Sequence, residues 1–467
     1  MKEKITFIGA GPVGCLAAIH FQRAGFEVEI FERRPDIRKS SIAAGRSINL
    51  ALSLRGIRAL NEVGSKIDVL KNAVPMFSRA MHDLKGSVTL SPYGIDQSFF
   101  INSISRSELN RELLSLAEEE QIKIHFAHSA IDYDFDSSKL KIETHDGEKL
   151  FFQAKHVVCT DGSSSHLRGN LMHKANGYQS LAPLGYAYKE LTVASGENSS
   201  FRLDKNSLHI WPRGNFMLIA LPNKDGSFTC TLFLAEEGSK DSFAFLDSPA
   251  KVNAFFETYF PDVMPLIENL AESFFSNPTG KLATVRCNPW YFNDQMLLLG
   301  DSAHGIVPFF GQGLNAGFED CYLLNKMLQE NSLKKSLKKS TDLKSLFQSF
   351  CDSRKVSTDA IANLALDNFI EMRDKVGQKR FLFEKEVERE LMRRYPNDYF
   401  SRYYLVTFSH VPYEIAWQVG KKQDELLQEI SEEHCDLSKL DFVKIYNQLK
   451  DKLESHNQVI RTFIQEN

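Results

Sequence analysis

Few cysteines and no long apolar runs occur in this sequence, and both shortages exclude whole classes of protein. The seven cysteines in 467 residues are scattered, and no two of them form a Cys-x-x-Cys pair. An odd, dispersed set of this kind predicts reduced thiols rather than a disulfide framework or a zinc site. No uninterrupted apolar run approaches the roughly 18 residues of a membrane span, and residues 1–9 lead straight into a strand pattern that leaves no room for a secretory signal. We therefore expect a cytoplasmic protein without a membrane anchor.

The sequence also lacks an excess of positive charge. Its 56 Lys and Arg against 60 Asp and Glu give a formal net charge of −4. This balance argues against nucleic acid as a partner, because a phosphate backbone needs a basic surface. No cluster of His, Cys and carboxylate residues suggests a metal site, so we predict no metal. The chain is long enough for about two or three domains.

What is present begins with a pattern at the N-terminus. Residues 4–9 read as an apolar strand that ends on a glycine turn, residues 12–24 as a helix with Gly25 at its C-terminal cap, and residues 27–32 as a second strand. This order predicts a β-α-β unit of the length that binds a dinucleotide.

The glycines of this unit each have a mechanical reason. Gly9 permits the tight turn, Gly11 lets the backbone approach a pyrophosphate, and Gly14 lets the helix pack closely on the strand. The helix N-terminus then offers free N–H groups to the phosphates. Glu32, at the end of the second strand, is placed to accept the ribose hydroxyls of an adenosine and would repel a 2′-phosphate. This β-α-β unit is therefore expected to bind FAD rather than NADPH.

A later segment of the sequence, residues 297–317, also fits FAD. Residues 297–301 form an apolar strand that delivers Asp301, which suits a ribityl hydroxyl, and residues 308–317 open another helix. The backbone amides of Gly313, Leu314 and Asn315 suit the carbonyl edge of a flavin ring, where the helix dipole stabilises the reduced anion. A nicotinamide-binding fold needs only the first motif. Residues 160–162 supply a second motif and this later segment a third, so three separate motifs indicate FAD.

Together with a middle motif, these segments resemble the class A flavoprotein monooxygenases of the para-hydroxybenzoate hydroxylase type. The middle motif runs Cys159-Thr160-Asp161-Gly162 and continues to Arg168; the family usually has a small residue in place of Thr160. The resemblance implies a mixed α/β fold with a Rossmann-like FAD-binding domain interleaved with a β-sheet substrate domain and followed by a helical C-terminal cap. We expect the FAD-binding domain at 1–75, 100–180 and 285–330, the substrate domain at 76–99 and 181–284, and the helical cap at 331–467. It also implies that NADPH binds transiently, without a second Rossmann domain.

Longer strings are similar to the kynurenine 3-monooxygenases within that class, over roughly residues 1–415. They lie at residues 45–53, 103–106, 208–213, 227–233, 307–313, 367–373 and 406–409. The resemblance implies that NADPH reduces FAD, that O2 adds to give a C4a-hydroperoxyflavin, and that its terminal oxygen attacks ring position 3 of L-kynurenine. The flavin and the electron-donating aryl amine of the substrate then carry the reaction, so we assign no catalytic side chain.

The same resemblance implies site residues. Besides the motif residues and Asp161, it implies cofactor contacts from Val13, Arg33, Arg46, Ala51, Arg106 and Pro308. Substrate contacts are implied for Arg79, Tyr93, Asn368 and Tyr403. A guanidinium fork holds the carboxylate of an amino-acid tail bidentately, which fits Arg79.

Several assignments stay open. Tyr404 is adjacent to Tyr403, and a slip of one residue would exchange them. Glu371 lies one helical turn from Asn368, so both could face the pocket. Phe309 and its neighbour Phe310 could wall the aromatic ring or belong to the core.

Two histidines and the activity itself each allow more than one interpretation. We expect His304 to be packed or capping, and His82 not to act as a general base. The protein could instead be a class A hydroxylase of another aromatic acid or phenol, or a non-catalytic flavin-fold binding protein. Either a monomer or a homodimer fits the sequence.

Overall fold

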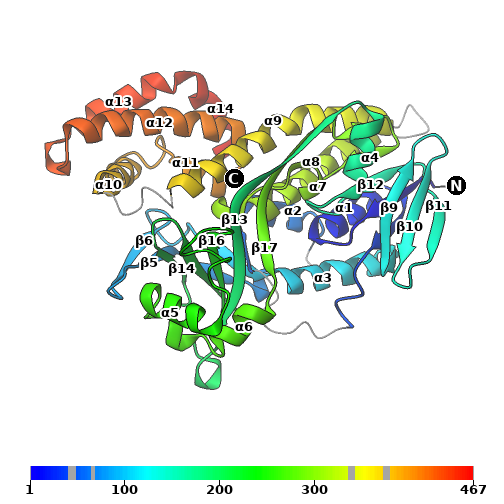
Figure 1. Ribbon diagram of the computed structural model, residues 1–467. Coiled ribbons are helices and arrows are strands. Elements are labelled where there is room, and N and C mark those ends of the chain that lie inside the picture. Colours follow the sequence, from blue (N-terminus) through cyan, green and yellow to red (C-terminus); the bar gives the residue numbers. More distant parts are fainter. Residues whose placement is uncertain (1, 40–48, 65–68, 335–341, 372–378, 466–467) are drawn as a thin grey trace.

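The structure, a computed structural model, describes residues 2–39, 49–64, 69–334, 342–371 and 379–465. Three parts are visible in Figure 1: a part around α1, called the nucleotide-binding part because we expect the dinucleotide there, a large sheet with α5 and α6, and a set of C-terminal helices. The mixed α/β fold class with a helical C-terminal region is confirmed. No helix within the described ranges is long and apolar enough to cross a membrane.

A six-stranded sheet forms the centre of the nucleotide-binding part. Its strands, in spatial order, are β18 (Tyr291–Phe292), β19 (Met296–Leu298), β12 (Val157–Cys159), β1 (Lys4–Ile8), β2 (Glu27–Glu32) and β8 (Lys123–Phe126). All neighbours are parallel except β18 and β19. Parallel strands are covered on both faces, which explains why β1 and β12 are almost continuously apolar and buried.

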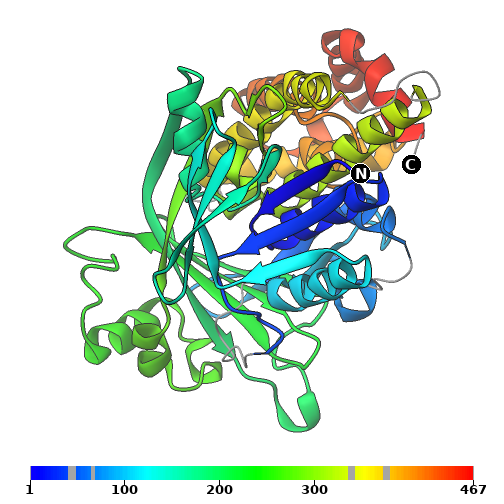
Figure 2. The same cartoon turned by 90° about the vertical axis from the view of Figure 1, so that its right-hand side faces the viewer.

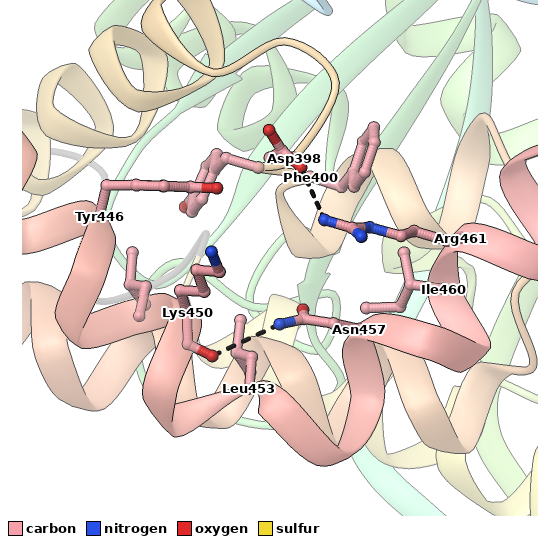
Figure 3. A pocket seen from close by; sticks show the side chains of 10 residues that line it. Asp398, Phe400, Tyr446, Lys450, Leu453, Asn457, Ile460 and Arg461 are labelled. Atoms are coloured by element: carbon pink, nitrogen blue, oxygen red, sulfur yellow. Dashed lines mark hydrogen bonds and ion pairs between the residues drawn. The ribbon is translucent and has the colours of Figure 1, made fainter.

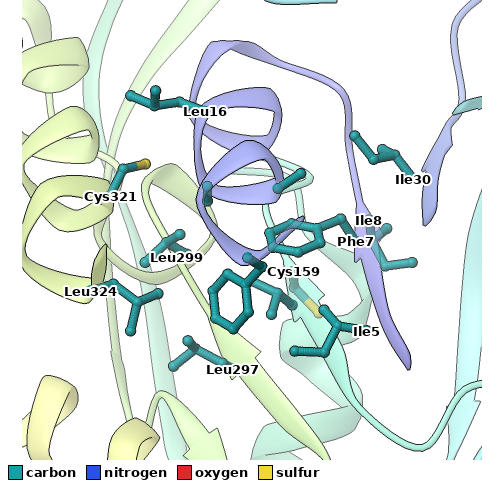
Figure 4. Close-up of a cluster of buried hydrophobic side chains, with 14 of the residues drawn as sticks. Ile5, Phe7, Ile8, Leu16, Ile30, Cys159, Leu297, Leu299, Cys321 and Leu324 are labelled. Atoms are coloured by element: carbon teal, nitrogen blue, oxygen red, sulfur yellow. The ribbon is translucent and has the colours of Figure 1, made fainter. Parts of the chain in front are cut away.

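Helices cover this sheet and bury a large core. They are α1 (Pro12–Arg23), α3 (Arg106–Glu119) and α8 (Gly313–Lys334), and α1 packs against both of the others. Figure 2 shows the blue N-terminal segment between the yellow and orange helices above it and the cyan helix α3 below it. The buried side chains that meet here include Ile5, Phe7, Ile8, Leu16, Ile30, Cys159, Leu297, Leu299, Cys321 and Leu324 (Figure 4).

Smaller elements surround this core. A three-stranded antiparallel sheet consists of β9 (His128–Asp134), β10 (Lys139–Thr144) and β11 (Lys149–Gln153), and a second one of β3 (Asn49–Leu52), β7 (Ile101–Ser105) and β4 (Val74–Met76). Helices α2 (Leu54–Asn61), α4 (His166–Lys174) and α7 (Asp301–His304) complete the part. Asp301, which we expected at the end of a strand, is the first residue of the short helix α7.

The large sheet has seven strands. Their order is β17 (Thr279–Asn288), β13 (Tyr178–Val193), β16 (Phe228–Ala235), β15 (Met217–Pro222), β14 (Ser207–Pro212), β5 (Ser78–His82) and β6 (Val88–Pro92). One face packs on α5 (Pro249–Tyr259) and α6 (Leu270–Ser276). Strands β13 and β17 run side by side through the middle of Figure 1 and cross the domain limits expected at 180 and 284, because one long ribbon connects the two parts.

Alternation along β5 decides which of its side chains face the site. Ser78, Ala80 and His82 are buried on the side of α5, where His82 stacks on Trp211 with ring centroids 4.0 Å apart. Arg79 therefore points from the opposite face, because successive side chains of a strand alternate.

The C-terminal helices cover that opposite face. They are α9 (Leu343–Ile370), α10 (Lys379–Arg394), α11 (Arg402–Thr407), α12 (Tyr413–Glu433), α13 (Phe442–Lys452) and α14 (Glu454–Gln465). Helix α9 packs on α8 and on α12, and α11 packs on α12. The helical C-terminal cap that we expected thus consists of separate helices.

Candidate active site

The first glycine turn has the geometry that a pyrophosphate requires. Gly9 has φ of 100°, and a Cβ there would lie 2.6 Å from the carbonyl oxygen of Thr160. A Cβ on Gly14 would lie 2.1 Å from the carbonyl oxygen of Gly9. A Cβ on Gly11, in contrast, would meet nothing within 4 Å, and no described side chain caps the N-terminus of α1. The turn is thus tightly packed on its inner side and open at Gly11.

Thr160, the departure from the family pattern, contributes to this turn. Its hydroxyl lies 2.9 Å from the carbonyl oxygens of both Ile8 and Gly9, to which it donates. The larger residue therefore ties the middle motif to the first one. Sequence reasoning missed this role, because the hydrogen bonds join residues about 150 positions apart.

Glu32 is held by two neighbours. Its carboxylate accepts hydrogen bonds from the Ala10 amide at 2.7 Å and from the Nε of Arg34 at 2.7 Å. Burial alone would raise the pKa of Glu32, but the hydrogen bonds and charge of Arg34 outweigh it and lower the pKa. Arg34, which the sequence did not single out, thus fixes an ionised Glu32. The predicted Arg33 is exposed.

The middle motif presents a second carboxylate. Asp161 is largely buried, and its Oδ1 lacks a hydrogen-bond partner among the described residues. Burial raises the pKa of Asp161, and a hydrogen bond from Ser165 opposes the rise. Such an atom suits a hydroxyl donor from a bound ligand.

The third motif lies against the first. Gly300 has φ of 63°, and a Cβ there would lie 3.1 Å from Val13; a Cβ on Gly317 would lie 2.7 Å from Val13. Val13 therefore fits between the third motif and α8. Asp301 and Pro308 are exposed on this side. Three sequence-distant motifs thus converge around one turn.

The start of α8 is tied to β3. The Asn315 amide accepts from the backbone N–H of Ser53 at 2.9 Å and donates to the carbonyl of Ala51 at 2.8 Å. Both ends of the Asn315 side chain thus bind the protein's own backbone. The flavin contact that we predict would then come from the backbone of the first turn of α8, which includes Gly313 and Leu314. Arg106 is exposed at the start of α3, and the predicted Arg46 lies outside the described residues.

Arg79 lies against two tyrosine rings. Its guanidinium carbon is 4.4 Å from the ring centroid of Tyr403 and 5.2 Å from that of Tyr93, and the two rings are stacked 5.5 Å apart. Burial alone would lower the pKa of Arg79, but the two tyrosines and the charge of Glu371 raise it. Tyr93 is buried, and its hydroxyl lacks a hydrogen-bond partner among the described residues. A cation that lies beside two phenols suits an anionic ligand group.

Tyr403 and Tyr404 differ clearly in their surroundings. The ring of Tyr403 stacks 5.8 Å from that of Phe310 and faces Arg79. Tyr404 packs instead on Phe99 and Phe400, with ring centroids 5.6 Å and 5.0 Å away. The geometry thus places Tyr403, and not Tyr404, beside Arg79.

Asn368 and Glu371 have different surroundings, although one helical turn separates them. The Nδ2 of Asn368 donates to the carbonyl oxygen of Phe309 at 2.7 Å. Glu371 forms ion pairs with Arg402 at 3.1 Å and with Lys385 at 3.8 Å. Glu371 is therefore engaged by other helices, and it acts on Arg79 only through its charge.

Phe309 is buried beside the sheet. Its ring centroid lies 5.0 Å from that of Phe233 and 4.5 Å from that of Phe369. It therefore joins α9 to the large sheet, while Phe310 lies on the side of Tyr403.

The two histidines have structural partners. The Nε2 of His304 lies 2.6 Å from Asp320, and both are buried. His82 is hydrogen-bonded to Asp262 at 3.0 Å and to His209 at 2.9 Å, on the face of β5 away from Arg79. His304, which we expected to be packed or capping, is thus buried against Asp320. Within the described residues, no group of His, Cys, Asp and Glu could hold a metal ion.

A small recess between the C-terminal helices is separate from this site. It has about 20 Å³ of space for water, and Figure 3 shows it lined by Tyr446, Leu453, Asn457 and Arg461, where Arg461 pairs with Asp398 at 3.0 Å. This is room for about one water molecule, and none of the predicted site residues lines the recess.

Comparison with known proteins identifies similar chains. A family model described as an FAD binding domain matches residues 2–335. A kynurenine 3-monooxygenase of Myxococcus xanthus (strain DK1622) is 47% identical over 435 residues, covering 92% of this chain and 91% of that protein. One of Dictyostelium discoideum is 40% identical over 453 residues, covering 95% and 96%.

Solved structures share the fold at low identity. A p-nitrophenol 4-monooxygenase from Pseudomonas putida DLL-E4 has a TM-score of 0.63 at 16% identity and covers 96% of this chain and 98% of that one. A Klebsiella pneumoniae protein, solved in complex with FAD and uric acid, has a TM-score of 0.62 at 18% identity and covers 80% and 90%.

Proposed function

The chain belongs to the kynurenine 3-monooxygenase family of FAD-dependent monooxygenases, and from this premise we propose that it hydroxylates L-kynurenine at ring position 3 with NADPH and O2. The observation that carries the substrate is Arg79, which lies beside the stacked rings of Tyr93 and Tyr403 on the covered face of the large sheet. The product would be 3-hydroxy-L-kynurenine.

The FAD would be held by the converging motifs. The amides at the start of α1 and the open space at Gly11 fit the pyrophosphate, and the fixed carboxylate of Glu32 fits the adenosine ribose. Asp301 and the first turn of α8 fit the ribityl chain and the ring edge. When bound, FAD would supply the transfer of electrons from NADPH to O2 and of one oxygen atom to the substrate ring.

The protein's own residues would bind and orient the substrate. The carboxylate of the amino-acid tail would pair with Arg79, because Glu371, the carboxylate whose charge acts on that guanidinium, is already paired with Arg402 and Lys385. The hydroxyls of Tyr93 and Tyr403 would complete the shell of the carboxylate. A tyrosine hydroxyl has a pKa near 10 in water, and burial raises the pKa of Tyr93 further, so Tyr93 remains a hydrogen-bond donor.

Aromatic side chains would place the substrate ring and exclude water. Phe310 stacks beside Tyr403, and Phe309 and Phe233 close the side towards the sheet. Dry surroundings matter because water would divert the activated oxygen to hydrogen peroxide. Asn368, oriented by its bond to the Phe309 carbonyl, lies next to this wall.

The test is substrate-dependent NADPH oxidation by the purified, flavin-containing protein. We expect L-kynurenine to stimulate oxidation and to appear as 3-hydroxy-L-kynurenine by mass spectrometry. Kynurenamine, which has the same ring but no carboxylate, should stimulate far less, and Arg79→Met should remove the difference between the two. A protein that ignores L-kynurenine but responds to salicylate or 4-hydroxybenzoate would be a hydroxylase of another aromatic acid. A protein that binds no flavin would contradict the proposal entirely.

A further inference from the structure

A buried arginine outside the substrate cluster connects the nucleotide-binding part to α11. Arg55 lies in the first turn of α2, and its side chain is 0% exposed. Its Nη1 forms an ion pair with Glu319 of α8 at 2.5 Å, and its guanidinium carbon lies 4.0 Å from the ring centroid of Tyr413. A charge removed from water to this extent needs full compensation.

The remaining donors of Arg55 go to backbone carbonyls. Its Nε donates to the Val406 carbonyl at 3.0 Å, and its Nη2 donates to the carbonyls of Leu405, at 3.2 Å, and Val411. Leu405 and Val406 are in the last turn of α11, whose carbonyls have no partner within the helix. A cation at this end also complements the helix dipole. Arg55 thus caps a helix that lies about 350 residues later in the chain.

The capped helix is the one that carries Tyr403. The residue lies in the first turn of α11, with its ring 4.4 Å from the guanidinium carbon of Arg79 and stacked on Phe310. A six-residue helix has little stability of its own, so its position depends on its packing against α12 and on the contacts at its two ends. At the other end, the Arg402 side chain pairs with Glu371 and Asp424.

We propose that Arg55 is a positioning residue for Tyr403. By fixing the C-terminal end of α11 to α2 and α8, Arg55 holds Tyr403 against Arg79. The two side chains thereby stay together as the binding site of the substrate tail, and water is excluded from it. The inference rests on the proposed function, since it assumes that the tail of L-kynurenine binds at Arg79. It predicts that a residue with no contact to the substrate controls substrate affinity.

The surroundings of Arg55 allow it to be changed without leaving a buried charge alone. Glu319 also pairs with Arg354 at 2.8 Å and with Arg58 at 3.5 Å. Arg58 offers a matched control: it lies on the same helix and faces the same carboxylate, and it stacks on Tyr322 at 4.0 Å rather than on the helices after residue 400.

The experiment compares Arg55→Lys and Arg55→Met with Arg58→Met in the flavin-containing enzyme. We expect both Arg55 variants to raise the KM for L-kynurenine about tenfold and to form more hydrogen peroxide per NADPH, because Lys cannot reach three carbonyls and Glu319 together. The Kd for FAD should stay within about twofold of wild type, and Arg58→Met should leave KM within about twofold.

A double variant separates positioning from general damage. If Arg55 acts through Tyr403, Arg55→Met should change KM little once Tyr403→Phe is present. An unchanged KM in both Arg55 variants, equal effects on KM and on FAD binding, or additive effects in the double variant would each overturn the inference. Arg55→Lys keeps the charge and serves if Arg55→Met does not fold. Wild-type enzyme that ignores L-kynurenine would instead refute the proposed function, which is a separate outcome.

Discussion

The glycine turn makes a prediction that separates folding from cofactor binding. In Gly14→Ala, the new Cβ would start 2.1 Å from the Gly9 carbonyl oxygen and 2.5 Å from the Thr160 hydroxyl, whereas real Cβ contacts stay beyond 3.0 Å. The backbone must shift by about 0.9 Å, from 2.1 Å to 3.0 Å. Overpacking of this kind costs about 1–3 kcal/mol, and disturbing the Thr160 hydrogen bonds adds about 1 kcal/mol. We therefore expect Gly14→Ala to lower the free energy of unfolding by about 3 kcal/mol, even without FAD.

Gly11→Ala should behave in the opposite way. Its Cβ would meet nothing within 4 Å, and its φ of −70° suits alanine, so the FAD-free protein should unfold at the wild-type temperature. The added methyl would occupy the space that the pyrophosphate needs, so the Kd for FAD should rise at least about tenfold. Thermal unfolding of FAD-free protein and titration with FAD measure the two effects. Gly169→Ala, whose Cβ would lie 3.9 Å from its nearest neighbour, is the control for both. Normal FAD affinity in Gly11→Ala would refute the assignment of the pyrophosphate to this turn.

Three other predictions address the rest of the molecule. Tyr403→Phe should raise the KM for L-kynurenine several-fold in steady-state kinetics, and Tyr404→Phe should not; the reverse result would exchange their roles. Burial raises the pKa of Glu190 from 4.5 to about 7, so between these pH values the folded state binds a proton that the unfolded state has lost. The free energy of unfolding of the wild type should therefore fall as the pH rises from 4.5 to 7, compared with that of Glu190→Gln. Urea unfolding at pH 5 and pH 8 measures this change. A difference in the free energy of unfolding between the two proteins that is the same at both pH values would contradict the prediction. Gly420→Ala should lower the unfolding temperature by a few degrees, because its Cβ would lie 2.4 Å from the Cδ of Arg402; an unchanged temperature would show that the arginine moves aside freely.

Features with local causes could be predicted from the sequence. The strand, turn and helix at residues 4–23 follow from apolar alternation and from glycines whose conformations the turn itself requires. Asp301 was placed at the tip of a strand by the apolar run before it, and the structure has β19 ending at Leu298 with Gly300 in the turn. Short-range patterns of this kind carry their own physical reason.

Features that depend on distant partners could not be predicted. Glu371 follows Asn368 by one helical turn, which suggested a shared pocket, but Arg402 and Lys385 approach it from two other helices. Arg34 rather than Arg33 binds Glu32, because the turn after β2 brings the Arg34 side chain back onto the Glu32 carboxylate, although both arginines are exposed. No spacing in the sequence encodes either arrangement.

Buried charges connect the C-terminal helix α11 to the part of the protein that would hold FAD. Arg55 and Glu319 come from the part that would hold FAD, and the carbonyls that Arg55 binds belong to the helix that carries Tyr403. Such a contact is costly unless every partner is in place, so α11 can adopt its position over Arg79 only when α2 and α8 are themselves folded. Because α8 would also supply the flavin contact, the proposed binding of the substrate tail and the proposed binding of the flavin ring depend on the same helix. Occupancy by FAD should therefore tighten the binding of L-kynurenine, and by thermodynamic reciprocity L-kynurenine should tighten the binding of FAD.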